Sequence, residues 1–297
     1  MNPEFRQLLS GQICRVHIGY ADGRPPEVLF ETDELVIEAP NWPLDGERLI
    51  VNGDGHLWSL ALDAPALAHI PLEGVPALNN DHVLAPDGER IFLSAYDGHI
   101  YEAPLDGGRA RRITPDREPR RLHFLHGVSP DGEALAYIGI EPDGPQGWGG
   151  ADVFALSLRD GTDTRLTHGP GPADGSEYAP RSPLIYLNTE AFSDVPGHAQ
   201  IARMSITGGD LEQLTHDDVV NWFPHLAPDE RHAVYLSFPA GTLGHPENAD
   251  VELKLVANDD WAHPRTVDRF FGGQGTINVN SWAPDSARFA YISYPVL

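Results

Sequence analysis

The fold is decided by residues 125–132, Leu-His-Gly-Val-Ser-Pro-Asp-Gly, which the alternating apolar run Ala-Leu-Ala-Tyr-Ile, residues 134–138, follows at once. The Pro-Asp-Gly step suits a tight turn, because proline presets φ, aspartate tolerates the next position, and glycine adopts positive φ. The stretch therefore predicts a β-hairpin, with one strand before the turn and one after it.

Versions of this stretch recur five more times, and three of them lack the final glycine; the copies lie at residues 41–46, 82–88, 177–182, 225–230 and 281–286. With residues 45, 87, 131, 181, 229 and 285 taken as equivalent, the spacings are 42, 44, 50, 48 and 56 residues. This period is close to the ~40–50 residues of a four-stranded propeller blade. A later strand closes the complete units with similar phrases, such as Arg-Leu-Thr at residues 165–167. The chain therefore predicts an all-β propeller.

Both ends of the chain contain half a blade. Residues 13–31 form two expected strands before the first repeat, and residues 277–297 form an expected inner half after the last one. We expect the two halves to complete one blade, which removes free sheet edges. The prediction is one six-bladed propeller over residues 1–297, with the other blades at residues 36–72, 79–114, 123–167, 174–215 and 221–267.

Charge and hydropathy restrict the partners. The formal net charge is −24 and Lys254 is the single lysine, whereas a nucleic-acid partner requires a basic surface. No apolar run approaches the ~20 residues that span a bilayer, and the N-terminal residues lack a secretory signal pattern. We expect a cytoplasmic protein that binds neither nucleic acid nor membrane.

The Ser-Pro-Asp-Gly turn, the alternating strand after it and the closing Arg-Leu-Thr resemble the TolB-type propeller family over nearly the whole chain. Because no separate N-terminal domain precedes the repeats, the likeness is to free-standing TolB-like propellers. The resemblance implies a six-bladed fold that can hold a protein or peptide. Two insertions, residues 141–150 and 239–250, are longer than hairpin turns require, and long loops on a rigid scaffold often carry function.

Polar residues gather on the innermost strands, which line the channel of a propeller. Buried polar groups are costly unless they bond one another, water or a ligand. We therefore predict a site at the channel mouth, with ligand-binding candidates Asn41, Asn80, Asp81, Asp174, Asn221 and Asn278, and acid–base candidates His82, His126 and Glu177. A polar channel filled only with ordered water is the alternative that the sequence leaves open.

Histidines on three facing inner strands, His82, His126 and His225, suggest a metal, because imidazole with amide or carboxylate oxygens suits Mn, Zn or Fe. The arrangement resembles the oligogalacturonate lyases, propellers with a manganese site of histidines and a glutamine. This resemblance implies His126, His225, His245 and Gln274 as metal ligands. The chain departs from that family after Gln274, where no closely spaced histidine follows, and its acidity suits a polyanionic uronate poorly.

Two functions remain open. The first is a metal-assisted lyase or hydrolase that acts on an oligosaccharide or another small polar ligand, with the ion polarising an oxygen or activating water and a histidine or Glu177 acting as base. The second is a non-catalytic scaffold that binds a protein or peptide. The chain has no Gly-x-Ser-x-Gly elbow, no P-loop and no dinucleotide fingerprint between a strand and a helix.

Overall fold

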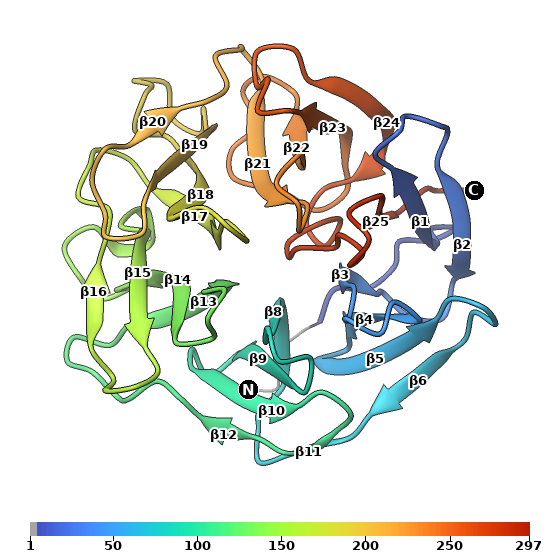
Figure 1. The fold of residues 1–297 in the computed structure, drawn as a ribbon, viewed down its shortest axis with the longest axis horizontal. Helices are drawn as coiled ribbons and strands as arrows, with labels where there is room; N and C mark the ends of the chain where they lie inside the picture. The colour runs from blue at the N-terminus through green and yellow to red at the C-terminus, as the bar shows by residue number, and fades with distance from the viewer. Residues whose placement is uncertain (1–4) are drawn as a thin grey trace.

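The structure is a computed structural model that describes residues 5–297, and it forms a ring of six antiparallel sheets around one axis (Figure 1). Five blades have four strands each. From the axis outwards, the first blade contains β3 (Glu38–Asn41), β4 (Arg48–Gly53), β5 (His56–Ala61) and β6 (Leu67–Ile70), and the second contains β8 (Leu78–Leu84), β9 (Arg90–Ala95), β10 (Ile100–Pro104) and β12 (Arg111–Arg112). The third contains β13 (Leu122–Val128), β14 (Ala134–Ile140), β15 (Asp152–Ser157) and β16 (Asp163–Arg165), and the fourth contains β17 (Ala173–Tyr178), β18 (Leu184–Thr189), β19 (Gln200–Ser205) and β20 (Glu212–Gln213). The fifth contains β21 (Val220–Leu226), β22 (His232–Phe238), β23 (Ala249–Ala257) and β24 (Arg265–Gly272).

Minor elements complete the description. Strands β7 (Leu72–Glu73) and β11 (Gly108–Arg109) form a short parallel pair between the first two blades. A 3₁₀ turn, Gly147–Gly149, lies in the first insertion. In residues 5–297 no helix has the length and hydropathy that crossing a bilayer would require.

The sixth blade closes the ring with strands from both ends of the chain. Strand β25 (Arg288–Ser293) pairs with β1 (Cys14–Tyr20), which in turn pairs with β2 (Glu27–Thr32) (Figure 1). The pairing of β1 with β25 is antiparallel over six residues, from Arg15 opposite Ser293 to Tyr20 opposite Arg288. This confirms the six-bladed all-β propeller, closed by N-terminal strands that complete the last blade.

The innermost position of this blade is less regular than its hairpin pattern predicts. Residues 277–282 form no named strand, and one bridge joins Trp282 to Phe289. Side-chain amides replace part of the strand pairing: Asn278 Oδ1 accepts from the Gly275 amide at 2.7 Å, and Asn280 Oδ1 accepts from the Trp282 amide at 3.0 Å. Asparagine competes with regular pairing in this way because its short side chain reaches nearby backbone groups.

The repeated turn folds as predicted and also where glycine is missing. The Gly132 amide donates to the Ser129 carbonyl at 2.8 Å, and Gly132 has φ of 72°. In two of the copies that lack glycine, Glu230 and Ser286 occupy the same left-handed region with φ of 59°. This conformation costs an L residue roughly 1–2 kcal/mol relative to glycine, so the closed ring holds these turns against local strain.

Every named inner strand carries a register shift in its middle. The shifts lie between Glu38 and Asn41, Leu78 and His82, Leu125 and Gly127, Asp174 and Glu177, and Trp222 and His225. A bulge adds a residue to one strand and re-aims the side chains on either side of it. The polar residues of one inner strand are therefore divided between different ends of the channel.

Candidate functional site

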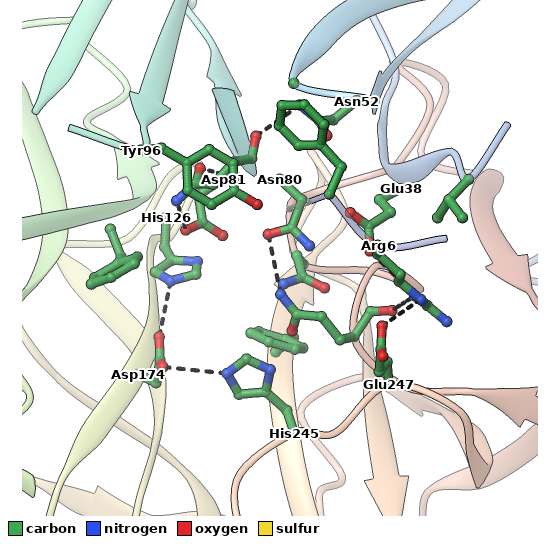
Figure 2. A pocket seen from close by; sticks show the side chains of 18 of the residues that line it. Arg6, Glu38, Asn52, Asn80, Asp81, Tyr96, His126, Asp174, His245 and Glu247 are labelled. Carbon is green, nitrogen blue, oxygen red and sulfur yellow. Dashed lines mark hydrogen bonds and ion pairs between the residues drawn. The ribbon is translucent and has the colours of Figure 1, made fainter. Parts of the chain in front are cut away.

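A cavity of about 380 Å³ lies at one mouth of the channel, where the inner strands begin. Its walls come from the starts of the inner strands, the loop between β22 and β23, the segment after β24, and the N-terminal residues Phe5 and Arg6 (Figure 2). Seven of the twelve residues predicted from the sequence line it: Asn80, Asp81, His126, Asp174, His245, Gln274 and Asn278. A volume of this size accommodates a small ligand.

The other five predicted residues do not line this cavity. His82 is buried and its Nδ1 lies 2.8 Å from Asn41 Oδ1. His225 is bonded through Nδ1 to Glu177 Oε2 at 2.5 Å, and both side chains are buried. Asn41 and Glu177 line a second cavity, at the opposite mouth. Asn221 is fully buried in a polar cluster between the fourth and fifth blades. We therefore do not keep these five in the proposed site.

One side of the cavity contains a histidine–aspartate–histidine group (Figure 2). His126 Nε2, from β13, lies 2.9 Å from Asp174 Oδ1, from β17. His245 comes from the second insertion, and its Nε2 lies 3.9 Å from Asp174 Oδ2. Asp174 is therefore within hydrogen-bond distance of His126, from a neighbouring blade, and near enough to His245, from a loop, for a charge interaction.

The two imidazoles have opposite pKa shifts. Burial would lower the pKa of His126, but the charge of Asp81 and the hydrogen bond to Asp174 raise it to about 9. Burial lowers the pKa of His245, and the Asp174 charge offsets this only in part. At neutral pH His126 is an imidazolium and His245 is neutral. Two titratable groups with pKa values pushed apart are the arrangement of an acid and a base.

The carboxyl groups of the cavity also differ. Burial would raise the pKa of Asp174, but its hydrogen bond with His126 lowers it. Burial, with the nearby charges of Asp174 and Glu38, raises the pKa of Asp81 to about 6, although the charge of His126 opposes the shift. Asp81 also accepts from Asn79 Nδ2 at 3.0 Å. Asp174 is thus the fixed anion, and Asp81 exchanges a proton near neutral pH.

The other side of the cavity is formed by residues that were not predicted from the sequence. Arg6 pairs with Glu38 at 3.2 Å and with Glu247 at 2.7 Å (Figure 2). The repeat does contain a signal for Glu38. Glu38, Asp174 and Asn278 each lie seven residues before the equivalent turn positions 45, 181 and 285, and all three line the cavity. Arg6 has no such signal, because it lies outside the repeats.

The second insertion reaches this site and the first does not. Residues 239–250 supply His245 and Glu247 to the cavity. Residues 141–150 instead border a separate hollow beside Arg117 and Arg121 on the third blade. Of the two loops predicted to carry function, only the second contributes side chains to the cavity.

Of the four predicted metal ligands, His126, His245 and Gln274 line the cavity and His225 does not. His225 is 1% exposed, and its two nitrogens bond Glu177 and the Ile277 carbonyl oxygen. His126 and His245 face Asp174 as described, and the raised pKa of His126 favours a proton over a metal ion. Within residues 5–297 no group of three or more His, Cys, Asp or Glu side chains has the geometry of a metal site. We derive no step through a metal.

Comparison with known proteins identifies the family. No protein-family model matches the chain. An uncharacterized protein of Agrobacterium fabrum is 35% identical over 276 residues, which cover 91% of this chain and 89% of the relative. A solved structure from Agrobacterium tumefaciens, assigned provisionally to TolB, superposes with a TM-score of 0.87 at 32% identity, over 96% of this chain and 99% of that chain.

The chain belongs to the TolB-like β-propeller family. TolB from Acinetobacter baumannii shares the fold with a TM-score of 0.64 at 18% identity, over 89% of this TolB-like chain and 65% of that one. An oligogalacturonate lyase in complex with manganese superposes with a TM-score of 0.55 at 14% identity, over 90% of this chain and 72% of that chain. At that identity the likeness to the lyase is one of fold alone.

Proposed function

We propose that this TolB-like propeller is an acid–base enzyme that binds a small carbohydrate in the cavity and cleaves it by hydrolysis or elimination. The observation that carries the proposal is the group of His126, Asp174 and His245, in which one carboxylate lies 2.9 Å from a protonated imidazole and 3.9 Å from a neutral one. Pairs of this kind transfer protons in the transition state when both groups reach the ligand. His126 and His245 both line the cavity.

The chemistry assigns one role to each imidazole. His126 Nε2 is engaged with Asp174, whereas its Nδ1 is buried and has no hydrogen-bond partner in residues 5–297. The imidazolium of His126 supplies the proton that the leaving oxygen of a sugar ligand takes up. The neutral His245 accepts the second proton, from water in hydrolysis or from a carbon next to a carbonyl group in elimination. Each turnover moves one proton off His126 and one onto His245, and exchange with solvent resets the pair.

The remaining lining suits a polyhydroxylated ligand. Side-chain amides from four separate places, Asn52, Asn80, Gln274 and Asn278, offer both donors and acceptors, and Tyr96 adds an aromatic ring. Five carboxyl groups line the cavity with one arginine and one protonated histidine, so acidic groups outnumber basic ones. This charge opposes a uronate and favours a neutral or basic sugar.

The test is a turnover assay with neutral, amino and uronic oligosaccharides, each with Mn²⁺ and with a chelator. We expect turnover on neutral or amino substrates in the chelator, lost in His126→Ala and in His245→Ala. His263→Ala, whose side chain is 82% exposed, is the matched control and should keep the wild-type rate. Turnover that requires Mn²⁺, or that survives both histidine changes, would contradict the assignment. Because elimination needs a carbonyl group beside the carbon that loses its proton, a neutral keto-sugar glycoside completes the panel, and an ultraviolet-absorbing conjugated product from it would identify elimination.

The opposite mouth favours the scaffold function as a second candidate. The cavity there, about 350 Å³, is ringed by apolar side chains, including Trp42, Trp282 and the exposed Leu44, together with the prolines of the repeated turns. Trp42 and Trp282 are themselves buried, so the exposed part of this rim is Leu44 with the prolines, and an apolar rim of this kind suits a protein partner. Recovery of one protein partner that Leu44→Asp abolishes, with no turnover on any substrate, would establish this function in place of the enzyme.

A further inference from the structure

Arg6 is held at the rim of the cavity by groups that accept hydrogen bonds or carry a negative charge. Its Nη1 donates to the Gln274 carbonyl oxygen at 2.7 Å and to Glu38 Oε1 at 3.2 Å. Its Nη2 donates to Asn248 Oδ1 at 3.2 Å, and its Nε lies 2.7 Å from Glu247 Oε2. The Arg6 side chain is only 9% exposed, although the residues that follow it along the arm are mostly exposed.

An aromatic ring completes this seat. The Arg6 guanidinium carbon lies 3.9 Å from the centre of the Tyr294 ring, a cation–π contact. Burial raises the pKa of Glu38 although the Arg6 charge opposes the shift, so Glu38 is costly to leave without a cation. Two carboxylates, a carbonyl, an amide oxygen and an aromatic face together form a recognition site for an organic cation, contributed entirely by the propeller.

A second observation comes from the cavity beside the seat. Gln274 Oε1 is a buried acceptor without a hydrogen-bond partner in residues 5–297. His126 is 4% exposed, and its Nδ1 also has no hydrogen-bond partner among these residues. Both side chains line the cavity, whose charge excess is negative even with Arg6 in place. The cavity thus has unused polar atoms and a net attraction for a basic ligand.

We propose that the seat of Arg6, formed by Glu38, Glu247, Asn248, Tyr294 and the Gln274 carbonyl, is a subsite for a guanidinium or primary ammonium group of a ligand. Arg6 occupies this subsite within the molecule, and the ligand's cation displaces it. The inference deepens the proposed function by naming an amine-bearing sugar as the substrate class. It concerns binding alone and does not need the acid–base step.

The test measures binding by calorimetry to the wild type, Arg6→Ala and Arg24→Ala. Arg24 is the matched control, since its side chain is 56% exposed and its ion pair lies at 3.9 Å. The probes are methylguanidinium, methylammonium, glucosamine and glucose at low millimolar concentration. We expect the three cationic probes to bind Arg6→Ala about tenfold tighter than the wild type. In the wild type Arg6 occupies the subsite, and the apparent affinity for a probe equals the intrinsic affinity multiplied by the fraction of molecules in which the subsite is free. Glucose should show no such gain.

A second variant keeps the test decisive if Arg6→Ala does not fold. Phe5 packs edge-on against Tyr96, with ring centres 5.8 Å apart. Phe5→Ala should therefore loosen the N-terminal segment that contains Arg6 and strengthen probe binding, although Arg6 itself is unchanged. Equal binding of the cationic probes to the wild type and to both variants would overturn the proposal, as would glucose binding as well as glucosamine. Because the readout is binding, failure of every turnover assay would leave these outcomes unaffected.

Discussion

Replacing Asp174 by asparagine should reduce the pH dependence of stability between pH 6.5 and 9. The pKa of His126 is about 9 in the folded protein, against an ordinary value of 6.5. A raised pKa means that His126 stabilises the fold fully below pH 6.5, and that this contribution is lost as the pH rises through 9. Since one pKa unit corresponds to 1.36 kcal/mol, the wild type should lose about 3 kcal/mol across this interval from His126.

Asp174→Asn keeps the shape of the side chain and an acceptor oxygen but removes the charge. Burial, which lowers the pKa of His126, is then opposed mainly by the charge of Asp81, so the variant should lose about 1–2 kcal/mol at pH 6.5 and have a shallower profile to pH 9. Urea unfolding at four pH values measures the profile, and ¹³C-histidine NMR reports the pKa directly. Asp106→Asn, 78% exposed, is the control. Parallel profiles of the wild type and Asp174→Asn would refute this reasoning.

Four further changes test the framework that holds the site. Glu177→Ala leaves His225 and two amide donors without their acceptor and should cost about 3 kcal/mol in urea unfolding; a change below about 0.5 kcal/mol would be inconsistent with this network. Gly127→Ala places a Cβ 2.8 Å from the carbonyl oxygen of Ser176 on the next inner strand, so the melting temperature should fall with a loss of roughly 1–3 kcal/mol, and an unchanged value would argue against this close approach. Burial lowers the pKa of His82 to about 3, so its neutral form stabilises the fold above pH 6.5 and this contribution is lost as the pH falls. His82→Gln should therefore reduce the dependence of the unfolding free energy on pH between pH 6 and 4, and an equally steep dependence in the variant would count against this reasoning. Ile18→Ala in the buried face of β1 should cost about 2–5 kcal/mol by calorimetry, and a near-neutral effect would mean that the closing blade contributes little to stability.

The candidate site could be predicted from the sequence only in part, and the bulges of the inner strands explain the limit. Asp174 and Glu177 lie on one strand and are both acidic, yet the register shift between them directs Asp174 to one mouth and Glu177 to the other. Asp81 lies within the register shift of its strand and lines the cavity, whereas the next residue, His82, is buried against Asn41. Sequence spacing alone assumes a regular strand, so it grouped residues that the bulges separate.

The sequence by itself determined the fold, because each repeat contains its own turn chemistry and alternating strands, and those signals are local. It also determined that the termini complete one blade, since each end contains the half that the other lacks. Only the tertiary structure decided which polar side chains meet. His126 and Asp174 are 48 residues apart and come from neighbouring blades, and Arg6 reaches Glu247 from outside the repeats. Contacts between blades depend on blade geometry and on the positions of the bulges, and local sequence spacing encodes neither.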